Sequence, residues 1–140
     1  MRFLAWHVDR FRCSITERGR SPVVEEYDDP ETVAEEALLL LISVEKGDEA
    51  APEEVAQKAV AEIAAHAANL KVETLVLHPF AHLFGQLGRP ATAVQVLQLM
   101  EKELRDKGMS VVRTPFGWFN TLDVQAKGHP LSRIARIIEA

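Results

Sequence analysis

The stretch Thr74-Leu75-Val76-Leu77-His78-Pro79-Phe80-Ala81-His82 is highly informative, because it joins a short apolar strand to a restricted turn. Proline fixes the backbone φ angle, so the turn is rigid. Two further turns of this kind are Pro115-Phe116-Gly117-Trp118-Phe119-Asn120 and Lys127-Gly128-His129-Pro130. Glycine permits positive φ and aromatic rings supply rigid walls, so the three turns predict a pocket built largely from backbone atoms.

Two long helices are predicted on either side of the first turn. Pro52 suits a first helical turn, and apolar residues from Val55 to Ala67 recur at four-residue steps, which predicts a helix over residues 52–70. A second amphipathic pattern follows Pro90 and ends at Lys107-Gly108, where a cation and a glycine are typical of a helix C-terminus.

Short apolar segments provide the strands. The run over residues 37–44 lacks alternation, so its pattern alone fits either a buried strand with a helical or irregular lead-in, or a buried helix. Other strands are predicted over residues 74–77, 110–113 and 118–126, and residues 2–8 and 11–16 are predicted to form a hairpin or two adjacent strands. Residues 17–31 are predicted to form a polar connection with a brief extended piece at 23–24. A short closing helix is predicted over 131–138. This order predicts an α/β (mixed α+β) fold with helices packed against a mixed sheet.

Size and charge limit the function classes. A chain of 140 residues is expected to form a single domain over 1–140, and no apolar run reaches the roughly 20 residues that span a bilayer. No signal-peptide core follows Met1, so a cytoplasmic location is expected. The net charge of -5 combines -10 over residues 17–62 with +3 over residues 102–140. Such a polarised chain remains compatible with binding only the end of an RNA strand.

Side-chain catalysts are scarce. His78 and His82 have the i,i+4 spacing of helical metal ligands, but Pro79 disfavours a helix there. Cys13 with His7 could form a nucleophile and base, although a buried structural thiol explains Cys13 more simply. Neither a cofactor nor a metal site is predicted.

Together with Leu41-Ile42-Ser43-Val44-Glu45-Lys46, the three turns resemble the N-terminal editing domain of archaeal threonyl-tRNA synthetases, whose relatives are the D-aminoacyl-tRNA deacylases. The resemblance runs nearly end to end and implies a D-aminoacyl-tRNA deacylase-like fold with residues 37–44 as a central strand. It also implies hydrolysis of serine mischarged onto threonine tRNA, through backbone groups of the pocket and the 2′-hydroxyl of the terminal adenosine. Implied partners are the tRNA 3′ end, the remaining synthetase domains or a separate synthetase, and a second copy of the chain in a homodimer.

The resemblance also assigns the site. Ala81, His82 and Asn120 are the expected catalytic positions, although His82 could equally be a hydrogen-bonded structural histidine. The expected substrate and tRNA contacts are Val44, Pro79, Phe80, Phe116, Gly117, Trp118, Phe119 and Lys127. Without the resemblance, the aromatic residues of this set would be interpreted as core, and Lys127 as part of a solvated turn. Arg113, Lys127, Arg133 and Arg136 are candidate phosphate contacts because of the basic C-terminal region.

Two positions depart from the family pattern. Asn120 stands where many relatives carry lysine, and Ser132-Arg133 stand where they carry a glutamate. Asparagine brings no charge and arginine reverses the sign of the acid, so a mechanism that needs either charge is in doubt. Two alternatives therefore stay open: a catalytically silent module that holds the tRNA 3′ end, and a D-aminoacyl-tRNA deacylase.

Overall fold

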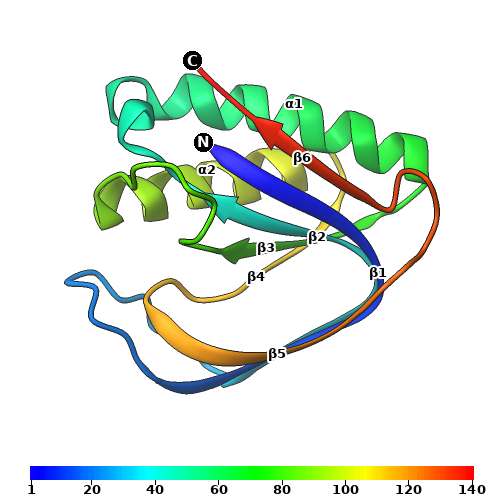
Figure 1. The fold of residues 1–140 in the computed structure, drawn as a ribbon, viewed down its shortest axis with the longest axis horizontal. Helices are drawn as coiled ribbons and strands as arrows, with labels where there is room; N and C mark the ends of the chain where they lie inside the picture. Colours follow the sequence, from blue (N-terminus) through cyan, green and yellow to red (C-terminus); the bar gives the residue numbers. More distant parts are fainter.

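The computed structural model describes residues 1–140 as one curled sheet with two helices on the same side of it (Figure 1). The strand order is β4-β3-β2-β1-β5, and β6 also pairs with β1. The elements are β1 (Arg2–Arg18), β2 (Glu31–Ser43), the 3₁₀ helix η1 (Lys46–Ala50), α1 (Pro52–Leu70), β3 (Thr74–Pro79), α2 (Pro90–Asp106), β4 (Ser110–Arg113), β5 (Trp118–Ala126) and β6 (Arg133–Ile137). The predicted mixed fold is confirmed.

The central strand β2 explains why residues 37–44 lack alternation. Leu38, Leu40 and Ile42 face the core formed with α1 and α2, whereas Leu39 and Leu41 face a second, smaller core on the opposite side of the sheet. A strand buried on both faces reads as a continuous apolar run. The expected strand is confirmed, but its lead-in is wrong, because β2 already begins at Glu31 and pairs with β1 there.

Both helices occupy the predicted places. Pro52 stands in the first turn of α1, which ends at Lys71 in the left-handed conformation with a φ of 58°. Buried residues of α1 such as Val60 and Ile63 pack into the larger core together with Val96 and Met100 of α2. Neither helix has the length and apolar character that a bilayer span requires.

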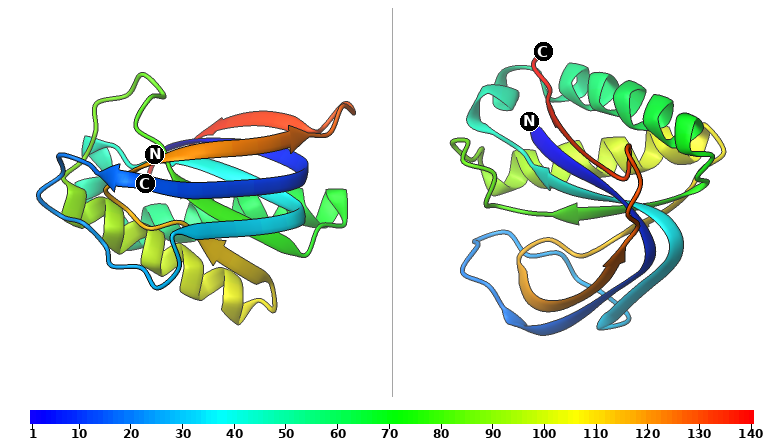
Figure 2. Two further views of the ribbon diagram at one scale, coloured as in Figure 1. Left: turned by 90° about the horizontal axis from the view of Figure 1, so that it is seen from below. Right: turned by 45° about the vertical axis from the view of Figure 1, so that its right-hand side comes forward.

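The predicted hairpin over residues 2–16 is wrong, because β1 runs through Asp9-Arg10 as a single strand. Asp9 and Arg10 lack the glycine or asparagine that a tight hairpin turn needs at positive φ. Instead the pairing of β1 with β5 is irregular between Val8 and Arg10. The sheet is strongly curled, so β1 bends along its length (Figure 2).

The predicted closing helix over 131–138 is also wrong, because residues 133–137 form β6. β5 pairs with β1 only from Val8 onward, which leaves the edge of Arg2–Trp6 free, and β6 pairs with that edge in antiparallel register. Backbone pairing to a free strand edge outweighs a weak local preference for helix. The polar connection ahead of Glu31 contains no regular element between residues 19 and 30, so the extended piece at 23–24 is not a strand.

The α-ammonium of Met1 is held inside the molecule. It donates to Asp48 Oδ1 at 2.8 Å and to the carbonyl of Ile138 at 2.9 Å, and Glu45 Oε1 lies 3.4 Å away. Asp48 is only 3% exposed, and its second oxygen accepts the Glu45 N–H at 2.7 Å. This buried charge pair joins the first strand to the segment that follows β2.

Candidate functional site

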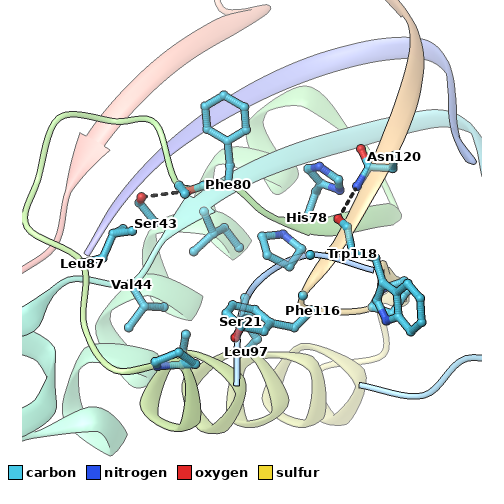
Figure 3. Close-up of a pocket in the computed structure, with 18 of the residues that line it drawn as sticks. Ser21, Ser43, Val44, His78, Phe80, Leu87, Leu97, Phe116, Trp118 and Asn120 are labelled. Atoms are coloured by element: carbon cyan, nitrogen blue, oxygen red, sulfur yellow. Dashed lines mark hydrogen bonds between the residues drawn. The ribbon is translucent and has the colours of Figure 1, made fainter. Parts of the chain in front are cut away.

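A cavity of about 360 Å³ opens between the C-terminal ends of β2 and β3 and the start of β5 (Figure 3). Its size is at the lower end of the range for small-molecule sites. Arg20 and His78 are the ionisable side chains among its lining residues. The lining comprises residues 19–21, 42–44, 78–81, 87, 88, 90, 93, 97 and 115–120.

One wall is the turn after β3, and β2 holds it rigidly. The Phe80 N–H donates to the Ile42 carbonyl at 2.8 Å, and the Ser43 hydroxyl donates to the Phe80 carbonyl at 2.7 Å. Because the C=O and N–H of a trans peptide point in opposite directions, fixing the Phe80 carbonyl also fixes the direction of the Ala81 N–H. No protein group accepts from that N–H. The turn therefore provides an oriented, free donor beside the cavity.

The opposite wall is the turn from Pro115 to Asn120. Gly117 has a φ of 94°, and a Cβ atom there would lie 2.9 Å from the Val23 carbonyl oxygen, so glycine is required. The Gly117 carbonyl accepts the Gly19 N–H at 2.9 Å. The Asn120 amide donates to the Trp118 carbonyl at 3.3 Å, while Phe119 remains 54% exposed.

His78 forms part of the cavity floor as a neutral group. Its side chain is buried, its Nδ1 lies 2.8 Å from the Thr114 hydroxyl, and its ring meets Phe11 edge-on at 6.0 Å. Burial lowers the pKa of His78 to about 4. A histidine with so low a pKa is a weak base at neutral pH.

The pH dependence of stability should report this buried histidine. An unfolded histidine takes up a proton below about pH 6.5, while folded His78 does so only near pH 4, so folding stability is lost as the pH falls through this window. Urea denaturation should show that the free energy of unfolding falls between pH 7 and pH 5 by about 2 kcal/mol less in His78→Gln than in the parent. Thr114→Val is the control and should keep the parent's pH dependence of stability. If His78→Gln also kept it, the low pKa would not belong to His78.

The structure brings most of the predicted site residues to one cavity. Those that line it are Val44, Pro79, Phe80, Ala81, Phe116, Gly117, Trp118, Phe119 and Asn120. His82 does not line it; the side chain is exposed and meets the Phe80 ring edge-on at 5.6 Å. His82 is thus exposed, whereas His78 is buried.

Lys127 lies at the far end of β5 from the cavity. Its ammonium pairs with Asp9 and with Glu36 Oε2, the latter at 3.0 Å. The hydrogen bonds that Lys127 donates to the carboxylates of Asp9 and Glu36 raise its pKa. Arg133 does not line the cavity either, and its Nη2 lies 3.5 Å from the Lys127 carbonyl.

Several lining residues were missed in the sequence. Residues 19–21 lie in the segment predicted as a polar connection, and the sequence predicts no site role for Ser43. Arg20 is exposed and has no carboxylate partner, whereas Arg113 and Arg136 both form ion pairs. The turn chemistry of Gly19 followed by Pro22 was the one available signal.

The Cys13 and His7 alternative loses its support. Cys13 is buried in the smaller core, and burial raises the pKa of its thiol. His7 instead meets His129, with Nδ1 and Nε2 2.9 Å apart. A thiol with a raised pKa is a poor nucleophile, so Cys13 is a structural residue.

Comparison with known proteins identifies the family. The sequence profile of the archaea-specific editing domain of threonyl-tRNA synthetase matches residues 1–138. The chain belongs to this family. The editing domain is 40% identical over 139 residues to a threonine–tRNA ligase of Thermococcus gammatolerans, covering 99% of this chain and 22% of the relative. It is 41% identical over 138 residues to the threonine–tRNA ligase of Methanococcus maripaludis, covering 99% of this chain and 22% of that relative. It is 37% identical over 142 residues to the threonine–tRNA ligase of Methanobrevibacter smithii, covering 100% of this chain and 23% of that relative. The editing domain thus spans about a fifth of the length of these ligases.

Proposed function

We propose that this cavity removes serine from mischarged threonine tRNA. The observation that carries the proposal is the rigid Phe80-Ala81 peptide, whose N–H has no acceptor in the protein. Both residues line a small cavity that has no side-chain nucleophile paired with a base. Family membership supplies the tRNA substrate class. The tRNA 3′ end is the proposed partner, together with the remaining synthetase domains or a separate synthetase, and a second copy of the chain.

In the proposed complex, the terminal adenine stacks on the aromatic wall of Phe116, Trp118 and Phe119. Base stacking on an aromatic ring contributes about 1–3 kcal/mol. The seryl ester then lies against the turn after Pro79, where the Ala81 N–H donates to the oxyanion that forms when water attacks the ester carbonyl. A preorganised donor of this kind typically contributes a factor of about 10²–10³.

Water activation is assigned to the substrate. The ribose 2′-hydroxyl, adjacent to the 3′ ester, accepts a proton from the attacking water and gives its own proton to the departing 3′-oxygen, because His78 is too weak a base and Arg20 is a cation. Asn120 orients the wall through its bond to the Trp118 carbonyl and needs no charge for this. Arg20 is the proposed phosphate contact at the cavity, in place of Lys127.

Selectivity depends on the stiffness of the cavity. Threonine carries one methyl group more than serine, and fit alone discriminates a group of that size by about 1–3 kcal/mol. A wall of backbone atoms held at Pro79 and Pro115 moves less than a wall of long side chains. The proposed deacylase excludes the threonyl ester by this steric limit.

The decisive experiment compares hydrolysis of L-seryl-, L-threonyl- and D-aminoacyl-tRNA by the same preparation. Rapid loss of the seryl ester alone is expected. Hydrolysis of the D-aminoacyl ester alone would assign the cavity to a chirality-checking deacylase. Binding of tRNA without hydrolysis of any ester would identify a silent 3′-end module and refute the proposal.

Ser43→Ala should slow hydrolysis by about tenfold to 10²-fold, because small misplacements of a catalytic group carry penalties of that size. The substitution removes the hydroxyl that fixes the Phe80 carbonyl and hence the Ala81 N–H. Single-turnover rates measure the effect. The matched control is Ser132→Ala, which removes a buried hydroxyl bonded to the His129 carbonyl at 2.7 Å, outside the cavity. Equal rates in both variants would contradict the role of Ser43.

A further inference from the structure

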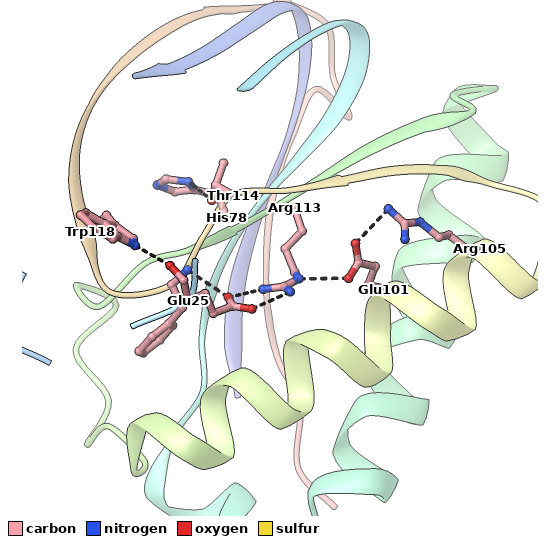
Figure 4. A network of polar contacts seen from close by, with 8 residues as sticks. Glu25, His78, Glu101, Arg105, Arg113, Thr114 and Trp118 are labelled. Carbon is pink, nitrogen blue, oxygen red and sulfur yellow. Dashed lines mark hydrogen bonds and ion pairs between the residues drawn. The ribbon is translucent and has the colours of Figure 1, made fainter. Parts of the chain in front are cut away.

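Glu25 belongs to the irregular segment over residues 19–30, yet its polar groups bind one short segment of the cavity wall (Figure 4). Its carboxylate forms two bonds with the Arg113 guanidinium, the Nη2–Oε2 pair at 2.7 Å, and Oε1 also accepts the Phe116 N–H at 3.0 Å. Its N–H donates to the Phe116 carbonyl at 3.0 Å, and its carbonyl accepts the Trp118 indole N–H at 2.7 Å. Glu25 thus binds the turn through hydrogen bonds of both its backbone and its side chain.

Arg113 links the Glu25 carboxylate to helix α2. Its Nε lies 3.2 Å from Glu101 Oε1, and Glu101 Oε2 lies 2.9 Å from Arg105. The side chains of Glu25 and Arg113 are 16% and 13% exposed, so this is a largely buried pair. Burial by itself raises the pKa of Glu25, but the hydrogen bonds from Arg113 and Phe116 outweigh it and hold the pKa below its usual value. The carboxylate is therefore charged at neutral pH.

The pairing of β5 with β1 begins only at Trp118, opposite Arg18, so Phe116 and Gly117 lie outside the sheet. Gly117 interrupts the aromatic wall with a φ of 94°, a conformation without the restraint of a side chain. The Gly19 N–H bonds to the Gly117 carbonyl, and the Tyr27 ring packs edge-on against Trp118 with centroids 4.9 Å apart. Both partners belong to the same irregular segment as Glu25, so the position of the turn before β5 and of the Trp118 ring depends in large part on where that segment is anchored.

We propose that Glu25 is a positioning residue that sets the place of Phe116 and Trp118, with the forked ion pair to Arg113 as its anchor. Its catalytic consequence rests on the proposed function, since the wall would hold the terminal adenosine. The position of the Trp118 ring is independent of that function. Loss of the anchor lets the wall move outward and weakens binding of the RNA end.

The test uses the full chain with Trp6→Phe, so that Trp118 is the only tryptophan. Glu25→Gln removes the charge but keeps the size, and Arg113→Lys keeps the charge but loses the planar fork. Glu26→Gln is the matched control, because Glu26 is the exposed neighbour and has no bonded partner. Each protein is measured well below its own melting midpoint, by acrylamide quenching of Trp118 fluorescence and by deacylation kinetics on seryl-tRNA.

Both anchor variants should raise the quenching constant about twofold and KM about tenfold, with kcat within about threefold, because lost binding that is equal in ground and transition states appears in KM. The control should match the parent. Unchanged quenching in Glu25→Gln and Arg113→Lys, or a loss of kcat with KM unchanged, would overturn the proposal. If one variant fails to fold, the other decides. If the parent hydrolyses no ester, the proposed function fails, while raised quenching in both variants would still support the positioning role.

Discussion

Replacing the 2′-hydroxyl of the terminal adenosine by hydrogen should slow hydrolysis of seryl-tRNA by about 10²- to 10⁴-fold, the range that general acid–base catalysis usually provides. The expectation follows from the cavity lining. Its ionisable side chains are Arg20, a cation, and His78, whose pKa of about 4 makes it a poor proton acceptor at neutral pH. The proposed mechanism therefore assigns the activation of water to the substrate hydroxyl.

Single-turnover hydrolysis of seryl-tRNA ending in adenosine or 2′-deoxyadenosine measures this effect directly. Binding of the two substrates should be compared separately, so that a change in affinity is not mistaken for a change in chemistry. Cys13→Ala provides the protein control and should stay within a few-fold of the parent, because this thiol is buried away from the cavity. Equal rates on the two substrates would exclude substrate assistance and require a base from the protein.

Asp48→Ala should lower the free energy of unfolding by about 3–5 kcal/mol, the usual result of removing one partner of a buried ion pair. Asp48 is the nearest counter-ion of the buried Met1 ammonium, at 2.8 Å, and also accepts the Glu45 N–H. After the substitution, Glu45 at 3.4 Å is the remaining carboxylate beside the ammonium. The buried charge is then poorly compensated.

Urea denaturation at neutral pH measures this loss, with a chain that starts at Met1 and carries no N-terminal tag. Asp123→Ala is the matched control, since Asp123 is 62% exposed and pairs with Arg10 at 3.7 Å. Exposed pairs contribute about 0–1 kcal/mol, so the control should change stability little. A loss below about 1 kcal/mol in Asp48→Ala would mean that water or Glu45 compensates the ammonium.

Much of the local structure could be predicted from neighbouring residues. Pro52 and the apolar spacing that follows it predicted α1, and the strand ending at Pro79 was also predicted. Proline and glycine act through local steric limits on φ, so their effect is visible without the rest of the fold. The same limits marked the two turns that became opposite walls of the cavity.

Distant pairings could not be predicted in this way. Nothing near residues 133–137 indicates that the edge of β1 is free there, and nothing near Asp9 indicates that the strand continues past it. The pairing of Lys127 with Asp9 and Glu36 is equally non-local, and it removes a cation expected to meet RNA. Such contacts depend on the path of the whole sheet.

The two long helices, the rigid turns and the family could thus be predicted from the sequence alone, because each depends on residue types within a short window or on motifs in a preserved order. Which side chains surround the cavity depends instead on the tertiary structure. Because β1 is curled, residues 19–21, which follow it, line the same cavity as residues 42–44. The polar connection therefore forms part of the cavity wall, and Glu25 in the same segment binds Arg113 beside it. A curl accumulates over many paired strand residues, so no single segment encodes it.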